Sequence, residues 1–339
     1  MNGWRRTSMN NRSTLLHSGF RDIVLLDPIK QGADSLKIVS GYATNTMASW
    51  HLQKIAESNV NPITITLVVG MCGFDGILNS VHEGFKSIVA RNNTPLQSNF
   101  YCQYVVEGAP VHSKLYLWEK EGTPFRAYLG SANYSQAAFA LQRRELLHEC
   151  DPIAALEYFN KIERNSMYCT HSEIDDKILI MPTHPIFEAE QDAHASIQGA
   201  GIENVTLTLL AKNGETGTRS GLNWGQRDGR EPNQAYIPLS APIMRSDFFP
   251  LIGNHSGKDN PHFSVLTDDG KNFILRVEQG GNKAITTPHN NSLIGEYFRN
   301  RIGLANGAYV WRRDLENYGR TDITFYKLGD EQYYMDFSV

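Results

Sequence analysis

The sequence predicts two units in succession, an α/β unit with a mixed sheet flanked by helices and then a mainly-β unit. Residues 35–164 alternate strand-like and helix-like segments, a proline-containing polar tract follows over 181–201, and short β-rich runs separated by turn residues begin at Val205. We therefore expect a first domain over 1–178, a linker or peripheral segment over 179–202, and a second domain over 203–339.

Composition allows each unit a core of its own. The chain has 339 residues, of which 41% are hydrophobic and 20% charged, so disordered and collagen-like classes are excluded. No run approaches the about 18 apolar residues of a membrane span, and the polar start, residues 1–12, lacks the apolar core of a secretory signal. Four scattered cysteines without paired spacing indicate buried or incidental thiols. We expect a cytoplasmic protein with no membrane contact.

The elements of the first unit follow from hydrophobic spacing. The run PITITLVV (62–69) is β-branched and nearly continuous, as in a strand whose sheet is covered on both faces. Ile77, Val81, Phe85 and Ile88 recur at helical spacing. In order, we expect strand 35–44, helix 47–57, strand 62–69, helix 77–90, strands 100–106, 111–118 and 126–129, helix 136–142, strand 145–149 and helix 152–164.

The second unit consists mainly of short strands. FSVL and NFILRV flank a turn with Asp269-Gly270, which predicts a hairpin, and residues 292–302 form the one helix-like segment. The remaining strand candidates are VTLTLLA, AYIPL, ITFYKL and QYYMDF. This pattern is typical of a small β-barrel or a sandwich.

His112 and Lys114 are the first candidate site residues. On the predicted strand 111–118 they project to one face, opposite the apolar set that includes Leu115 and Leu117. A lysine supplies charge to phosphate oxygens, and a neutral imidazole nitrogen can attack phosphorus. Alone, such a pair is more often a solvated face of a strand.

A second motif, Gly130-Ser131-Ala132-Asn133, ends the next strand. Its Ser and Asn offer polar side chains, and its glycine allows a close approach of the backbone to an anion. The combination HSKLYLW…AYLGSANYS resembles the signature of the phospholipase D superfamily. The resemblance implies that His112 forms a covalent phosphohistidine, that Lys114 holds the phosphate, and that Ser131 and Asn133 bind its other oxygens.

Two acidic residues bear on this resemblance. The family pattern places an aspartate five residues after the lysine, where this chain has Glu119, and nuclease members often lack that aspartate. Glu145 stands where nuclease members place a glutamate that orients the histidine. Its alternative interpretation is a surface charge beside Arg143 and Arg144.

The number of motifs predicts the oligomeric state. Of the eleven histidines, only His112 is followed by a lysine two residues later. Chemistry of this family needs one histidine to attack and another to protonate the leaving oxygen. We therefore expect a homodimer with one composite site at its two-fold axis. No metal and no cofactor are expected, because lysines supply the positive charge and no residues have metal-ligand spacing.

Two polar tracts of the second unit predict DNA recognition. Residues 218–233 (TRSGLNWGQRDGREPN) and 283–291 (KAITTPHNN) are rich in side chains that bind bases or phosphates. A mobile surface loop is the alternative for the first tract. The net charge of −4 and the pI of about 6.3 lower the expectation of DNA binding without excluding it, since basic residues can gather locally.

Two such loops on a small β-barrel resemble the two arms of a B3-like pseudobarrel. A phospholipase D-like half followed by a B3-like half resembles type II restriction endonucleases of the NgoAVII/NgoFVII type, with BfiI more distant. The resemblance implies site-specific cleavage of double-stranded DNA, and a companion methyltransferase or separate ATPase as partner. The candidate DNA-binding residues are Trp224, Gln226, Arg227, Arg230, Asn233 and Gln234 in the first arm, and Lys283, Thr287, His289, Asn291 and Arg299 in the second.

Three rival functions remain. A lipid or nucleotide phosphodiesterase shares the catalytic motif, but the polar loops offer no apolar substrate groove. A DNA-binding protein with a non-catalytic first half would have no reason to retain His112, Lys114, Ser131 and Asn133 together. A non-specific or repair nuclease differs in binding DNA regardless of sequence.

Overall fold

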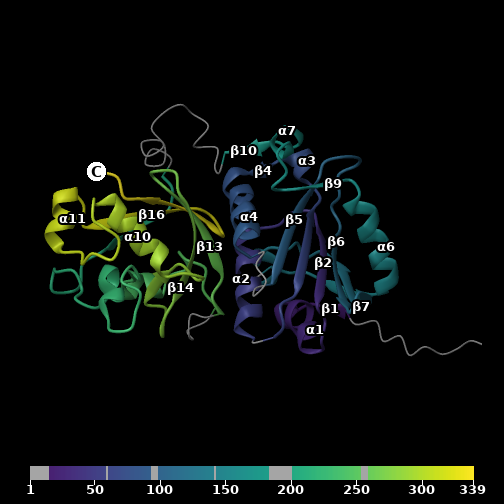
Figure 1. Ribbon diagram of the computed structural model, residues 1–339, viewed down its shortest axis with the longest axis horizontal. Coiled ribbons are helices and arrows are strands. Elements are labelled where there is room, and N and C mark those ends of the chain that lie inside the picture. The colour runs from purple at the N-terminus through teal and green to yellow at the C-terminus, as the bar shows by residue number, and fades with distance from the viewer. Residues whose placement is uncertain (1–14, 59, 93–97, 141–142, 183–200, 253–258) are drawn as a thin grey trace, which may run out of the picture.

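The computed structural model describes residues 15–58, 60–92, 98–140, 143–182, 201–252 and 259–339. Figure 1 shows two units side by side, the first in purple to teal and the second in green to yellow. Most of the predicted linker, residues 183–200, and the polar start of the chain lie outside the described residues.

The first unit is built on an eight-stranded mixed sheet of order β1-β8-β7-β6-β2-β3-β5-β9, as expected. The β2–β3 and β3–β5 pairs are parallel, and the other pairs are antiparallel. The strands are β1 (Leu15–Leu16), β2 (Ser35–Ser40), β3 (Thr64–Val69), β5 (Asn99–Val105), β6 (Lys114–Lys120), β7 (Thr123–Gly130), β8 (Leu147–Cys150) and β9 (Ser166–Tyr168).

Helices cover both faces of this sheet. Helices α2 (Asn45–Glu57) and α4 (Asn79–Asn92) lie on the face toward the second unit, and α6 (Pro152–Glu163) covers the opposite face (Figure 1). The strand residues are therefore buried on both sides: Tyr116 and Trp118 in the larger core, Leu115 and Leu117 under α6. The shorter helices are a π-helical turn (Arg21–Leu26), α1 (Asp27–Lys30), α3 (Cys72–Asp75), α5 (Gln136–Phe139) and α7 (Ile174–Lys177).

The structure of the first unit differs from the sequence prediction in two places, the start of strand β6 and the segment after residue 178. Strand β6 begins at Lys114, so His112 precedes the strand and lies in a loop. The two-residue strand β10 (Ile180–Met181) pairs in parallel with β4 (Ile77–Leu78), so this unit reaches at least Met181.

The second unit is one seven-stranded sheet of order β11-β16-β17-β13-β14-β15-β12, whose outermost strands β11 and β12 approach each other. The sequence predicted either a barrel or a sandwich, and the single, nearly closed sheet shows that the unit is a barrel. The predicted hairpin is present as β13–β14. Its strands are β11 (Asn204–Thr208), β12 (Ile237–Pro238), β13 (His262–Thr267), β14 (Asn272–Glu278), β15 (Ala284–Thr286), β16 (Asp322–Gly329) and β17 (Gln332–Asp336).

The helices of the second unit pack against a separate core. Phe298 of α10 and Phe325 of β16 are both fully buried in it. The helical segments are a 3₁₀ turn (Gly221–Gln226), α9 (Ala241–Met244), α10 (Ser292–Arg301) and α11 (Arg312–Tyr318). The barrel meets the first unit through β13, which lies along α2 (Figure 1).

Candidate functional site

His112 and Lys114 meet at one edge of the first sheet. The His112 loop is held against β3 by the backbone bond from Val111 N to Gly70 O, at 3.1 Å. Lys114 starts β6 opposite Ser40, and its Nζ lies 3.0 Å from His112 Nδ1 and 2.6 Å from the His112 carbonyl oxygen. The imidazole is exposed, whereas Lys114 is only 6% exposed. Lys114 is therefore held inside the protein, whereas the His112 imidazole is accessible to a ligand.

The Lys114 side chain lies close to both nitrogens of the ring, 3.0 Å from Nδ1 and 3.3 Å from Nε2. An ammonium can only donate, and a ring nitrogen that carries a lone pair is the kind that can attack phosphorus. Desolvation lowers the pKa of Lys114, and the nearby carboxylate of Glu145 opposes that shift. A phosphate that entered the site would give the buried cation a second negative partner.

Asn133 and Gly41 lie close to the His112 ring. Asn133 Oδ1 accepts from Tyr42 N at 3.2 Å and from Ser40 Oγ at 3.4 Å, so the amide is oriented with its NH₂ group available to an anion. A Cβ at Gly41 would lie 3.1 Å from His112 Cδ2 and 3.6 Å from Asn133 Oδ1. The glycine thus allows the imidazole and the amide to approach each other.

Ser131 and Glu145 lie together. Ser131 Oγ donates to the Glu145 carboxylate and accepts from Leu146 N at 3.0 Å. Within the described part of the chain, the hydrogen bond of Glu145 is to Ser131 rather than to His112. Glu145 is half-buried and influences Lys114, so its geometry fits a site residue that orients the serine better than one that orients the histidine.

Glu119 lies away from the site. It stands at the far end of β6, is 6% exposed, and forms a 2.7 Å ion pair with Lys37 of β2. The position where the superfamily places an aspartate therefore has a structural partner here.

Tyr42 is a site residue that the sequence analysis missed. Its ring packs edge-on against His112 with 5.7 Å between ring centroids, and its hydroxyl donates to Asp75 of α3. This hydrogen bond raises the pKa of Tyr42. The signal for it was its place directly after β2, because strand ends line the sites of such sheets.

The first predicted arm is only partly available for binding. Arg227 and Arg230 are exposed, and the Arg230 guanidinium lies 4.1 Å from the ring centroid of Trp224 while donating to Gln234 Oε1 at 2.9 Å. These contacts hold Arg230 in one orientation at the surface.

Two residues of the first arm have structural roles instead. Asn233 is 6% exposed and accepts from Gly307 N through Oδ1 at 2.6 Å. Gln226 donates to the carbonyl oxygens of Gly307 and Pro232, at 3.1 and 3.2 Å. Both side chains brace the arm against Gly307, and their expected base contacts remain predictions.

Arg299, predicted as a DNA ligand, is also held inside the structure. It is fully buried in α10, and its guanidinium donates to backbone carbonyls, among them those of Ala308 at 2.7 Å and Leu222 at 3.0 Å. Sequence alone cannot distinguish this arginine from a DNA ligand, because its carbonyl partners come from distant segments.

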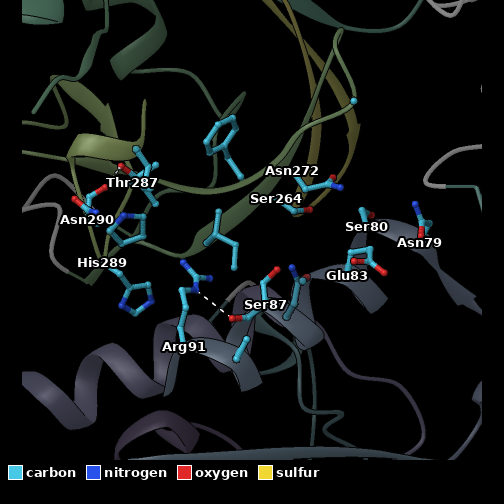
Figure 2. A pocket seen from close by; sticks show the side chains of 18 residues that line it. Asn79, Ser80, Glu83, Ser87, Arg91, Ser264, Asn272, Thr287, His289 and Asn290 are labelled. Atoms are coloured by element: carbon cyan, nitrogen blue, oxygen red, sulfur yellow. Dashed lines mark hydrogen bonds between the residues drawn. The ribbon is translucent and has the colours of Figure 1, made fainter. Parts of the chain in front are cut away.

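The second predicted arm faces the first unit. His289 Nε2 bonds Ser49 Oγ of α2 at 2.8 Å, and Thr287 is 2% exposed with its hydroxyl donating to Asn290 O. Both residues line a cleft of about 710 Å³ between the units, opposite Arg91 of α4 (Figure 2). Of the other residues predicted for the second arm, Lys283 is exposed and Asn291 directly precedes α10. Because His289 and Thr287 face the first unit, the predicted arm as a whole is not a free surface.

Another exposed segment, which includes Tyr309, Trp311 and Arg313, lies beside the first arm. Trp311 is 52% exposed, packs against Tyr309 with 4.4 Å between ring centroids, and lies under the guanidinium of Arg313. Asn223 of the first arm bonds the backbone of Val310, which brings the two segments together. The signal missed in the sequence was two aromatic residues followed directly by two arginines in AYVWRR.

Among the described residues, no group of three or more His, Cys, Asp or Glu is arranged to hold a metal ion. Within the same residues, no helix has the length and apolar character needed to cross a membrane.

Two family models match the chain. Residues 18–176 match the N-terminal PLD domain of the NgoFVII restriction endonuclease, and residues 197–329 match the NgoFVII C-terminal B3-like DNA-binding domain. No curated protein sequence matches it significantly.

Solved structures are similar to the first unit at low identity. NucT from Helicobacter pylori has 16% identity and a TM-score of 0.31, covering 46% of this chain and 98% of its own. Nuc, a phospholipase D family member from Salmonella typhimurium, has 17% identity and a TM-score of 0.32, covering 46% and 96%. Polyphosphate kinase from Porphyromonas gingivalis has 16% identity and a TM-score of 0.30, covering 55% and 27%.

Proposed function

Because the chain belongs to the NgoFVII restriction endonuclease family, we propose that it cleaves double-stranded DNA at a short specific sequence through His112. The observation that carries this proposal is the contact between the exposed imidazole of His112 and the buried ammonium of Lys114, with the Asn133 amide near the ring. The first unit cleaves and the second unit recognises the sequence.

The reaction runs through a phosphohistidine and uses no metal. A neutral ring nitrogen of His112 attacks phosphorus and forms a P–N bond, while the P–O bond to one deoxyribose breaks. The departing oxygen takes a proton from a second imidazole. Water then attacks the same phosphorus and gives a proton to the second imidazole, while the P–N bond breaks and His112 leaves as the free nucleophile. Lys114, Ser131 and Asn133 bind the non-bridging oxygens throughout.

The second imidazole comes from another copy of the chain. Each subunit has a single His-x-Lys motif, so one complete site requires two subunits around a two-fold axis. Large apolar side chains are exposed on the segments around His112 and support this arrangement: Tyr42 (43% exposed) packs against its ring, Phe74 (71%) lines a hollow with Gly70, and Leu146 (50%) is bonded to Ser131. Burying them against a second copy would remove apolar surface from water at the edge of the sheet where the imidazoles must meet.

DNA is bound by what we call the recognition surface, made of the exposed parts of two adjacent segments of the barrel. Its arginines are suited to bidentate bonds with guanine, and its aromatic rings to packing in the groove. The net charge of −4 is compatible with this role because the basic residues are gathered locally. The recognition surface comprises Trp224, Arg227, Arg230, Gln234, Tyr309, Trp311 and Arg313.

The proposed setting is the cytoplasm, with a companion methyltransferase that protects the recognition sequence in the host's own DNA. A separate ATPase subunit is a further candidate partner. Testing either partner begins with the recognition sequence, which digestion of a sequenced plasmid and mapping of the fragment ends will provide.

The direct test is cleavage of plasmid DNA in excess EDTA. We expect defined fragments from the wild-type protein, no cleavage by His112→Ala, and the same DNA affinity for both in a gel mobility shift. Glu119→Gln is the matched control, because that residue lies at the far end of β6, and it should cleave. Loss of wild-type cleavage upon chelation, or cleavage by His112→Ala, would overturn the proposed mechanism.

A further inference from the structure

Glu331 belongs to the second unit, but its carboxylate is bound by the first. It lies in the turn between β16 and β17 and is 6% exposed. Its oxygens accept from Thr44 Oγ1 at 3.0 Å, from Thr46 Oγ1, and from the backbone N–H of Ala137 at 2.9 Å. A buried carboxylate with three donors from the other unit is a built contact rather than an incidental one.

The donors lie at the starts of two helices. Thr44 is the N-cap of α2, and its hydroxyl also accepts from Met47 N. Ala137 lies in the first turn of α5, whose N-cap is Ser135. First-turn N–H groups have no partner within their helix, so the carboxylate satisfies a donor that would otherwise be buried unpaired.

The same two segments carry the candidate active site. Residues 40–46 and 131–137 run alongside each other, joined by the bonds Tyr134 N to Ser40 Oγ at 2.9 Å and Thr44 N to Tyr134 O at 3.1 Å. At one end the Asn133 amide accepts from Tyr42 N. At the other end both segments are tied to Glu331.

We propose that Glu331 is a positioning residue of the nuclease site, through which the docked recognition unit holds Asn133 and Gly41 in place around His112. This inference rests on the proposed function. Removing the carboxylate leaves the Ala137 N–H and two threonine hydroxyls without their acceptor, so the two segments relax. A displacement of about 1 Å in an active site lowers the reaction rate. The loss of the carboxylate should therefore lower the cleavage rate and leave the affinity for DNA unchanged.

The test compares variants at two interdomain contacts. Asp259 forms a 2.7 Å ion pair with Lys54 near the end of α2, away from both catalytic segments, so Asp259→Ala is the matched control. We expect Glu331→Ala to lower the single-turnover cleavage rate at saturating protein by about tenfold or more. Its Kd for the same DNA should stay within about twofold of wild type. Glu331→Gln, which keeps an acceptor for Ala137, should recover much of the rate, and Asp259→Ala should cleave as wild type.

Each other outcome has a defined meaning. If Glu331→Ala cleaves at the same rate as the wild type, the inference about Glu331 is overturned, but the proposed nuclease function is not. If the wild-type protein itself does not cleave, the proposed function is overturned. Equal losses of rate and affinity in Glu331→Ala and Asp259→Ala would indicate general docking and also overturn it. If Glu331→Ala does not fold, the isosteric Thr46→Val decides: a reduced rate with unchanged Kd supports the inference, and a wild-type rate overturns it.

Discussion

At the scale of single residues, Arg230 is the side chain of the recognition surface whose geometry is best defined. Its guanidinium is exposed, packs over Trp224 and holds Gln234 Oε1. Such restraint reduces the side-chain entropy that binding would otherwise cost. The same contacts leave the outer edge of the fork free to meet a base or a phosphate.

Arg230→Ala should weaken binding to the cognate site by about 1–3 kcal/mol, or about 5- to 150-fold in Kd, because a bidentate contact is lost. Fluorescence anisotropy with a labelled duplex measures this. Arg164→Ala, an exposed arginine after α6 in the first unit, is the control and should bind as wild type. If Arg230→Ala binds the cognate duplex normally, Arg230 is not part of the recognition surface.

His51 makes folding sensitive to acid. It is fully buried in α2, accepts from the Tyr134 hydroxyl at 2.9 Å, and donates to Leu25 O at 3.2 Å. Desolvation lowers its pKa from 6.5 to about 4. Between these values the unfolded chain binds the proton more readily than the folded one, so stability is present above pH 6.5 and is lost as the pH falls toward 4.

From pH 7 to pH 5, the free energy of unfolding should therefore fall by about 2 kcal/mol on account of His51. Urea unfolding at both pH values measures the change. His51→Gln is expected to be less stable at pH 7 but to lose about 2 kcal/mol less on acidification. The exposed His17→Gln should retain the wild-type pH dependence. Identical pH dependence in His51→Gln and wild type would contradict the assignment.

Residue chemistry was predictable from sequence where it is local. Motif spacing and strand ends predicted that His112, Lys114, Ser131 and Asn133 would lie near one another, and their role in cleavage remains a prediction. The burial of Arg299 was not predictable, because its environment depends on carbonyls from segments up to 77 positions away. Burial by distant segments leaves no local signal in the chain.

At the scale of elements, the end of β3 positions the loop that carries His112. Gly70 follows β3, and a Cβ there would lie 1.9 Å from Val111 O. This close approach explains how Val111 can bond Gly70 and how His112, the next residue, is held beside Gly41. The prediction that His112 lies within a strand was wrong because the pairing of β6 with β2 stops at Lys114 and Ser40.

Gly70→Ala should destabilise the fold by about 1–3 kcal/mol and slow cleavage, since the added methyl group displaces Val111 and with it His112. Chemical denaturation and the cleavage assay measure the two effects. A Cβ at Gly280 would have no heavy atom of the described chain within 4 Å beyond its own neighbours, so Gly280→Ala is the control and should be near neutral in both assays. A Gly70→Ala protein of wild-type stability would show that the backbone shifts freely there.

At the scale of the whole molecule, the two units and their fold classes were predictable, because hydrophobic periodicity and turn residues are local properties. Their mutual arrangement was not. Glu331 bonds Ala137 at the start of α5 and Thr44 at the start of α2, which are 194 and 287 positions away in the sequence. His289 bonds Ser49, 240 positions away. Consequently the second predicted arm was assigned to DNA, although it lines the interdomain cleft.

The proposed dimer makes a prediction about the assembled molecule. If the composite site forms where the exposed apolar side chains flank His112, a charge among them should prevent association, because burying an unpaired carboxylate at an interface is costly. Phe74→Glu combined with Leu146→Glu should therefore be monomeric in sedimentation equilibrium at concentrations where the wild type is dimeric.

The monomeric variant should bind cognate DNA through its intact recognition surface but fail to cleave it, since one imidazole has no partner to protonate the leaving oxygen. Ile153→Glu is the matched control, because Ile153 is 63% exposed on α6 rather than beside His112, and it should remain a cleaving dimer. Cleavage by a protein that sediments as a monomer even at saturating DNA would mean that one subunit completes the reaction by itself.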